Sequence, residues 1–213
     1  MQPFAQVPND LPSGGARAPE QTRRELLLAA EREIHLHGYQ AASLARIIAT
    51  TGVTKGALYH HFPSKQALGY AVLDEIWAPQ LRALWVEPMI QSRECPVDLL
   101  IRLIVEAGQQ MAQDDVRLGC PINNIAQEMS PIDEGFRDRV NALLAEWRGA
   151  IAEALARGQQ QGTVIARIQP EATATLLVAS LEGCVGMAKN AQSKELLMQC
   201  GAGVIDFLQS LRR

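Results

Sequence analysis

Four residues with groups suited to nucleic-acid contact lie close together in the sequence TKGALYHH, which begins at Thr54. Lys55, Gly56, Tyr59 and His60 fall at i, i+1, i+4 and i+5, so they share one face of a helix that Thr54 can cap. A cation, a hydroxyl and an imidazole on an exposed face can bind phosphates and base edges, and glycine lets the helix approach a groove closely. We interpret this face as a DNA-reading surface.

A helix, a turn and a second helix would position this surface. Ser43 can cap a short helix whose apolar residues Leu44, Ile47 and Ile48 fall at i, i+3 and i+4. Gly52 can then take the positive φ that a sharp reversal needs. Two short helices joined by a glycine-containing turn, with polar groups exposed on the second, are typical of a helix-turn-helix element.

Helical periodicity extends over the rest of the chain. A capping box at Thr22 predicts a helix that ends near His37, and Ser64 can cap a fourth helix that Pro79 and Pro88 should kink or end. Further helices are expected at about 97–113, 122–129, 130–160, 170–190 and 193–211. Because no useful stretch shows strand-like alternation, the expected fold class is all-α, with about nine helices.

Composition and charge narrow the class of protein. The chain has 213 residues, of which 47% are hydrophobic, and its formal net charge is −3. Residues 20–66 carry six Lys and Arg against four Glu, whereas residues 67–213 carry thirteen against eighteen acidic residues. This asymmetry favours phosphate contact at the N-terminal end. The sequence has no apolar stretch long enough to span a membrane and no signal-peptide pattern, so we expect a cytoplasmic protein with a disordered arm at residues 1–19.

The cysteines and histidines show no metal-site spacing. Cysteines stand at positions 95, 120, 184 and 200 without a CxxC or CxxH pattern, and in a reducing compartment we expect free thiols. Histidines at 35, 37, 60 and 61 suit phosphate contact or the core better than zinc, which prefers four ligands and usually cysteine. We expect no metal and no cofactor. No Ser-His-acid set, carboxylate pair or Gly-rich phosphate loop is evident, so we expect no catalytic residues and no enzyme.

The segment GYQAASLARIIATTGVTKGALYHHFPSKQAL, from Gly38 to Leu68, closely resembles the signature of TetR-family transcriptional regulators of the AcrR-like branch. The matching positions are Gly38, Tyr39, Ser43, Ile47, Gly52, Val53, Thr54, Lys55, Gly56, Leu58, Tyr59, His61, Phe62, Ser64, Lys65 and Leu68. The sequence GCPINNIAQE with the following SPIDEGFR also resembles a recurrent feature of one branch of the family.

The resemblance implies a homodimer that places two recognition helices in a palindromic DNA operator and is released by a small-molecule effector. Residues 20–66 would form the helix-turn-helix domain, and residues 67–213 the ligand-binding and dimerisation domain. The candidate DNA contacts are Thr22, Ser43, Thr54, Lys55, Gly56, Tyr59, His60 and Lys65. Leu58 and Phe62 are assigned to the core. Thr22 and Ser43 can equally serve only as caps, and Arg46 is either a DNA backbone contact or a surface residue.

The implied C-terminal sites are less closely specified. Candidate ligand contacts are Trp77, Trp85, Met111, Cys120, Asn123, Asn124, Gln127, Trp147 and Met187, although Met111 and Trp147 also suit a plain core. Candidate dimer contacts are Leu177, Leu181, Gly183, Gly186, Leu197, Gly201, Val204, Ile205 and Leu208, with packing inside one subunit as the alternative.

Cys120 suggests a second function of a different class. It precedes a helix start, where the helix dipole can lower its pKa, and Lys189 can approach it. The alternative to a ligand-responsive repressor is therefore a small-molecule-binding or cysteine-based redox protein in which DNA binding is vestigial. A small buried residue in a turn is the simpler interpretation of Cys120.

Overall fold

The computed structural model describes residues 19–213, with Asp114 described by its backbone alone. Over this range the regular elements are helices, apart from one isolated antiparallel bridge between Val164 and Arg212. The all-α prediction is confirmed. The predicted arm lies outside the described residues except for Pro19, which begins α1. None of the described helices combines the length and apolar character needed to cross a bilayer.

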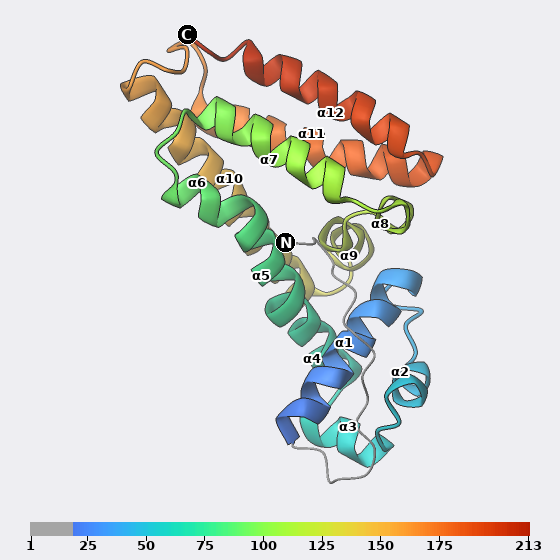
Figure 1. Ribbon diagram of the computed structural model, residues 1–213. Coiled ribbons are helices and arrows are strands. Elements are labelled where there is room, and N and C mark those ends of the chain that lie inside the picture. The colour runs from blue at the N-terminus through green and yellow to red at the C-terminus, as the bar shows by residue number, and fades with distance from the viewer. Residues whose placement is uncertain (1–18) are drawn as a thin grey trace.

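The N-terminal unit consists of α1 (Pro19–His37), α2 (Leu44–Thr51) and α3 (Lys55–His61), with α4 (Lys65–Val72) packed on α1 (Figure 1). The hydroxyls of Ser43, Thr54 and Ser64 each accept a hydrogen bond from the backbone three residues later, as predicted for caps. The predicted cap at Thr22 is wrong. Because proline is favoured in the first helical turn, α1 already begins at Pro19 and Thr22 lies inside it.

A long helical rod leaves this unit. After α4 it continues through the π-helical turn η1 (Leu73–Trp77), α5 (Ala78–Leu81), the π-helical turn η2 (Arg82–Val86) and α6 (Glu87–Gln91). The prediction that Pro79 or Pro88 could end this helix is wrong, because the rod continues past both prolines. Directly before each proline, a backbone N–H bonds to the carbonyl five residues back, so a wide turn absorbs the missing donor.

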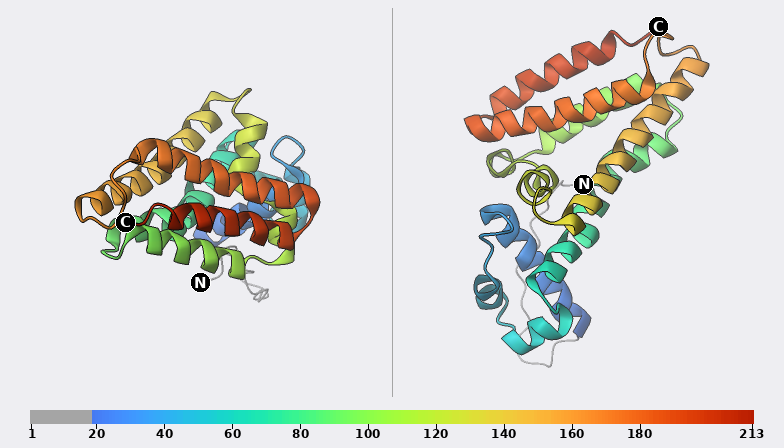
Figure 2. Two further views of the ribbon diagram at one scale, coloured as in Figure 1. Left: turned by 90° about the horizontal axis from the view of Figure 1, so that it is seen from above. Right: turned by 180° about the vertical axis from the view of Figure 1, so that it is seen from behind.

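The C-terminal part contains α7 (Pro96–Gln110), α8 (Gln113–Leu118), α9 (Pro121–Met129), α10 (Glu134–Gln160), α11 (Pro170–Ala191) and α12 (Lys194–Gln209). The short helix α8 was not predicted, because its residues were assigned to a break. Helices α7, α11 and α12 lie side by side at the end opposite the N-terminal unit, and Figure 2 shows this layer from above. Helix α10 runs along the rod, and α9 lies between the two ends of the molecule (Figure 1).

One hydrophobic core cluster runs from the N-terminal unit into the C-terminal helices. Leu58 and Phe62 belong to it, as predicted. At the junction, the rings of Tyr39 and Phe136 meet edge to face, 4.7 Å apart, and a Cβ on Gly69 would lie within 3 Å of both rings. The absence of a side chain at Gly69 therefore lets α4 approach this aromatic pair closely.

A disulfide joins Cys184 on α11 to Cys200 on α12. The expectation of four free thiols is wrong for this pair and holds for Cys95 and Cys120. The two bonded cysteines are 16 residues apart, and they meet only because α11 and α12 fold back on one another. Spacing in the sequence does not reveal such a pair, because nothing local to either cysteine indicates the hairpin.

Loop closure predicts the contribution of this disulfide. For a closed loop of this length, the cross-link should raise the free energy of unfolding by about 3 kcal/mol. Urea unfolding should therefore show that a reductant, or Cys184→Ser with Cys200→Ser, destabilises the protein by about that amount. Cys95→Ser should leave the effect of the reductant in place. A wild-type protein that unfolds identically with and without reductant would contradict the cross-link.

Candidate functional site

The face of α3 predicted to read DNA is open. Its four predicted contact residues are all exposed: Lys55, Gly56, Tyr59 and His60. Tyr59 as a whole residue is 42% exposed. The Lys55 ammonium lies 6.0 Å from the centre of the Tyr59 ring. A Cβ on Gly56 would meet nothing within 4 Å, so packing inside the protein does not require glycine there. A cation, a hydroxyl and an imidazole thus share a surface with room for a close partner.

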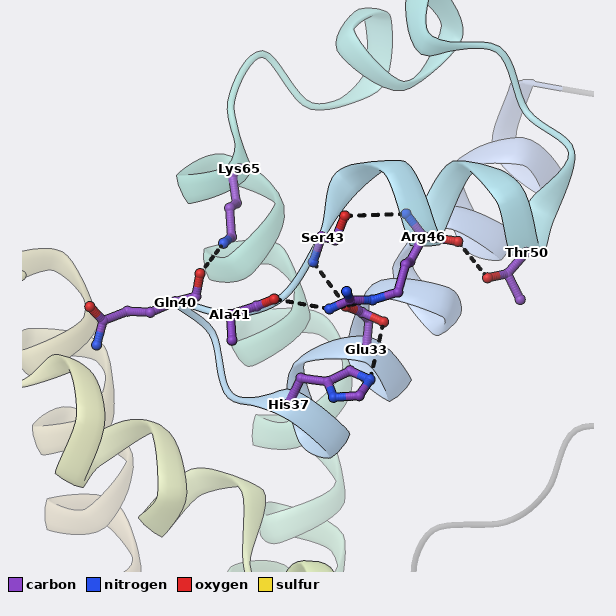
Figure 3. Close-up of polar contacts among 8 residues, drawn as sticks. All are labelled: Glu33, His37, Gln40, Ala41, Ser43, Arg46, Thr50 and Lys65. Carbon is purple, nitrogen blue, oxygen red and sulfur yellow. Dashed lines mark hydrogen bonds and ion pairs between the residues drawn. The ribbon is translucent and has the colours of Figure 1, made fainter.

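The buried carboxylate of Glu33 fixes the start of α2, the helix that precedes α3 (Figure 3). Glu33 on α1 is only 8% exposed, and its Oε1 accepts hydrogen bonds from Ser43 N at 2.9 Å and Arg46 Nε at 2.7 Å. The Arg46 guanidinium also donates to the Ala41 carbonyl, at 3.0 Å. Burial opposes ionisation of Glu33, but the hydrogen bonds from Arg46 and Ser43 outweigh it and hold its pKa below the usual value. Arg46 therefore positions the start of α2.

Two further DNA candidates, Lys65 and Thr22, lie outside the exposed face of α3. Lys65 donates to the Gln40 carbonyl at 2.9 Å (Figure 3). Its ammonium lies 5.0 Å from the centre of the Tyr39 ring. Burial lowers the pKa of Lys65. This lysine holds the linker between α1 and α2. Thr22 is part of the α1 surface and caps nothing.

Helix α9 holds the same linker from the C-terminal side. Glu128 accepts a hydrogen bond from Tyr39 N at 2.8 Å on one carboxylate oxygen and from Gln40 N at 2.7 Å on the other. Gly38, just before them, has a φ of +80° and would place a Cβ 3.0 Å from this carboxylate. The α1–α2 linker is thus bound to α9 by two charge-assisted hydrogen bonds. Sequence reasoning missed both Glu33 and Glu128, since the groups that donate hydrogen bonds to them lie between 10 and 89 residues away in the sequence.

Two adjoining cavities, of about 260 and 410 Å³, lie among the C-terminal helices. Both are lined by Leu84, Trp85, Cys120, Trp147 and Glu182. Trp77 lines the larger cavity and Met111 the smaller one. Five of the nine candidate ligand residues therefore border the same space.

The other four candidates do not line it. Asn124 donates to the Leu118 carbonyl at 2.8 Å and accepts from Lys189 Nζ at 2.7 Å, so it stabilises the turn before α9. Asn123 accepts from the exposed Gln127 at 3.5 Å. Met187 is 57% exposed on the outer surface of α11. The family resemblance placed the pocket among the C-terminal helices, but it did not show which way each face of α9 and α11 points.

Glu182 is the cavity residue that sequence reasoning missed. Its Oε2 is enclosed and has no hydrogen-bond partner in the described part of the chain, and the same is true of the Trp147 indole nitrogen. Burial raises the pKa of Glu182 to about 7, although a hydrogen bond with the Cys120 thiol partly opposes the shift. Two residues of a mainly apolar lining, Glu182 and Trp147, therefore each have an enclosed polar atom without a partner in the described part of the chain.

The pKa of the Cys120 thiol is raised, which speaks against the hypothesis of an activated thiolate. Burial, together with the nearby Glu182 carboxyl, raises the pKa of this thiol, although the backbone N–H groups at the start of α9 act in the opposite direction. Lys189, expected to favour the thiolate, is bound to Asn124 instead. Within residues 19–213 no group of three metal-ligating side chains is arranged to hold an ion.

The candidate dimer residues divide into three groups. Leu177, Leu197, Val204 and Leu208 are buried inside the protomer, so assigning them to an interface is wrong. Leu181, Gly201 and Ile205 border the smaller cavity. Gly183 and Gly186 are exposed, and a Cβ on either would meet nothing within 4 Å. Apolar residues exposed near them on α11 and α12 are Leu176, Met187, Met198 and Phe207.

The raised pKa of Glu182 predicts a specific pH dependence. Because the folded protein keeps the proton that the unfolded chain loses, this group's contribution to stability is present below its usual pKa and is lost as pH rises through about 7. Between pH 5.5 and 8 the wild type should lose roughly 2 kcal/mol of unfolding free energy through this group. Glu182→Gln should not show that loss. Urea unfolding at both pH values measures it. Glu153→Gln, at an exposed position, should track the wild type, and a parallel response of Glu182→Gln would refute the prediction.

Comparisons with known proteins agree with this arrangement. The family model for bacterial regulatory proteins of the tetR family matches residues 26–72, and the model for the C-terminal domain of LmrA/YxaF-like transcriptional regulators matches residues 96–202. The HTH-type transcriptional repressor DhaR of Mycobacterium sp. (strain GP1) is 26% identical over 86% of this chain and 89% of its own length. The HTH-type transcriptional regulator LmrA of Bacillus subtilis is 25% identical over 88% of this chain and 97% of its own.

Solved structures show the same fold. A TetR transcriptional regulator from Chloroflexus aurantiacus superposes with a TM-score of 0.80 at 25% identity, covering 92% of this chain and 98% of that one. The reduced form of NemR from Escherichia coli superposes with a TM-score of 0.78 at 24% identity, covering 91% and 97%. With the C-terminal match spanning half of the sequence and the helix-turn-helix match preceding it, the chain belongs to the TetR family of non-enzymatic transcriptional regulators, with an LmrA/YxaF-like C-terminal domain.

Proposed function

We propose that this protein is a repressor that binds a palindromic operator as a homodimer and releases it when a small molecule enters the cavities between η1–α6, α7, α9, α10, α11 and α12. The observation that carries the proposal is the position of α9. One end of this helix forms part of the cavity wall, and the other end holds the linker that leads into the helix-turn-helix. The protein acts in the cytoplasm, where the operator lies.

The exposed face of α3 supplies the DNA contacts. Placed in the major groove, Lys55 reaches a guanine edge or a phosphate, while Gly56 allows close approach. Tyr59 and His60 bind phosphates and set the register of the helix. Thr54 caps α3 and remains exposed to the backbone of the DNA. Ser43 and Lys65 act through the position of α2, because their polar groups are engaged within the protein.

A path of direct contacts supports coupling between cavity and DNA. Cys120, Pro121 and Ile122 line the larger cavity at the start of α9. Glu128, two turns further along, binds the backbone of Tyr39 and Gln40. A ligand that displaces the first turn of α9 therefore moves the support of α2 and α3, which changes the separation of the two recognition helices in a dimer.

The outer surface of α11 and α12 supports dimerisation. Small and apolar residues are exposed there at helical spacing, including Leu176, Gly183, Gly186 and Met187 on α11 and Phe207 on α12. Exposed glycines allow close approach of a second helix pair. Two helices from each subunit then form a symmetric interface in which the same surface meets itself.

Cysteine-based sensing is the alternative function. The Cys184–Cys200 disulfide next to the smaller cavity is the observation that favours it. The partly buried Cys120, whose pKa is raised, speaks against it, since the thiolate is the reactive form.

Operator binding tests the DNA-reading surface. Lys55→Ala should weaken binding to a palindromic fragment from upstream of the gene by about tenfold and flatten the log–log dependence on salt by about one unit. Arg167→Ala is the matched control, because it removes one exposed positive charge from the loop before α11. Electrophoretic mobility shifts over a range of salt concentrations give both quantities. Equal losses in the two variants, or undetectable binding by the wild type, would refute the assignment.

The role of Glu128 can be measured without knowing the effector. Glu128→Ala removes both acceptors from the linker, so the amides of Tyr39 and Gln40 should exchange with solvent at least about tenfold faster. Operator affinity should fall as well, because α2 and α3 lose a support. Gln127→Ala, at the neighbouring exposed position, is the control. Unchanged exchange in Glu128→Ala would exclude α9 as the support of the linker.

A further inference from the structure

Two polar atoms of residues that line the paired cavities lack partners among residues 19–213, and they differ in kind. The Glu182 Oε2 accepts a hydrogen bond, or a salt bridge when the carboxyl is ionised, whereas the Trp147 Nε1–H donates. An enclosed polar atom without a partner costs about 1–3 kcal/mol, and more if it is charged. A molecule that satisfies both atoms must carry a donor and an acceptor. The remaining lining, largely leucines, isoleucines and tryptophans, suits an apolar body.

The charges around the cavities favour a cation as the donor. Among the lining residues that the structure describes, the charged or chargeable carboxyls are Glu182 and Glu106, and the only cation is Arg102. Arg102 donates to Glu94 at 3.2 Å and to Glu106 at 3.3 Å, so its charge is engaged away from Glu182. The ionised form of the Glu182 carboxyl therefore has no free counter-charge among the described residues that line the cavities.

The aromatic lining also suits a positive charge. The indole rings of Trp85 and Trp147 lie 5.3 Å apart with an angle of 32° between their planes, and both border each cavity. Indole faces attract cations through the negative potential of the ring, and tryptophan does so most strongly. A positive nitrogen near Glu182 would then be stabilised by the carboxylate and by these rings together.

We propose that the effector is a largely apolar organic amine, whose protonated nitrogen pairs with Glu182 and whose oxygen acceptor binds the Trp147 N–H. This inference rests on the proposed function, since it names the ligand class of the same cavity. The size of the cavities and their apolar lining determine the body of the molecule, and the two unpaired atoms determine its polar groups. An amine that enters displaces the side chains around Cys120, at the start of α9.

A matched series of probes tests the charge. The full-length protein without DNA is titrated by calorimetry with 3-phenoxypropylamine, 3-phenoxypropanol and 3-phenoxypropanoate, which share a phenoxy ring and an ether oxygen. The amine should bind at least about tenfold more tightly than the alcohol or the carboxylate, because a charge-assisted hydrogen bond replaces a neutral or repulsive contact. Equal binding of all three, tighter binding of the carboxylate, or no binding of the amine would overturn the proposal.

Protein variants locate the effect. Glu182→Gln should weaken amine binding by about tenfold and leave alcohol binding within about twofold, and Glu153→Gln should change neither. Amine binding to the wild type should also tighten between pH 5.5 and 8 as Glu182 ionises. The other titratable groups that line the cavities are Cys120, Arg102 and Glu106. They are the same for all three probes, so their titration does not explain a difference between the amine and the alcohol. An amine preference that survives in Glu182→Gln would overturn the assignment to Glu182.

Operator binding separates this inference from the proposed function. If the wild type binds its operator with steep salt dependence but shows no preference for the amine, the ligand class is wrong and the regulator assignment stands. If the amine binds selectively while no operator fragment is bound, the cavity chemistry is right and the DNA-binding proposal fails.

Discussion

The two hydrogen bonds from Tyr39 and Gln40 to Glu128 are the contact on which the rest of the structure depends. They join the linker before α2 to a helix that begins in the cavity wall. On the other side, Lys65 holds the Gln40 carbonyl and Glu33 holds the start of α2. The helix-turn-helix is therefore a firmly supported element whose support comes partly from the ligand-binding half of the chain.

The cavity and the joint impose different physical demands. The joint consists of satisfied polar groups, which fix the geometry because breaking any one of them leaves a backbone donor or acceptor unpaired. The cavity instead leaves Glu182 Oε2 and the Trp147 N–H without partners in the described part of the chain. Those atoms cost stability in the empty protein and are available to stabilise a ligand. A regulator needs both properties, since a rigid connection transmits a displacement and an unsatisfied site creates the preference for the bound state.

The fold was largely predictable from sequence, and the errors have physical causes. The caps at Ser43, Thr54 and Ser64 were found because capping depends on atoms three residues apart. Pro79 and Pro88 were expected to kink or end the rod, yet it continues past both because π-helical turns absorb the missing donors. The sequence predicts free thiols at Cys184 and Cys200, and this is wrong because their pairing depends on how α11 packs against α12.

The sequence by itself determined the helical class, the helix-turn-helix and the exposed residues of α3, because these depend on local hydrogen bonds and a period of 3.6 residues. Only the tertiary structure decided which residues meet across long separations. Glu128 is 88 residues from Gln40, and Glu182 reaches the space beside Trp147 from a different helix. Four of the predicted dimer residues proved to be core for the same reason: periodicity shows that a helix has an apolar face, but packing decides what covers that face.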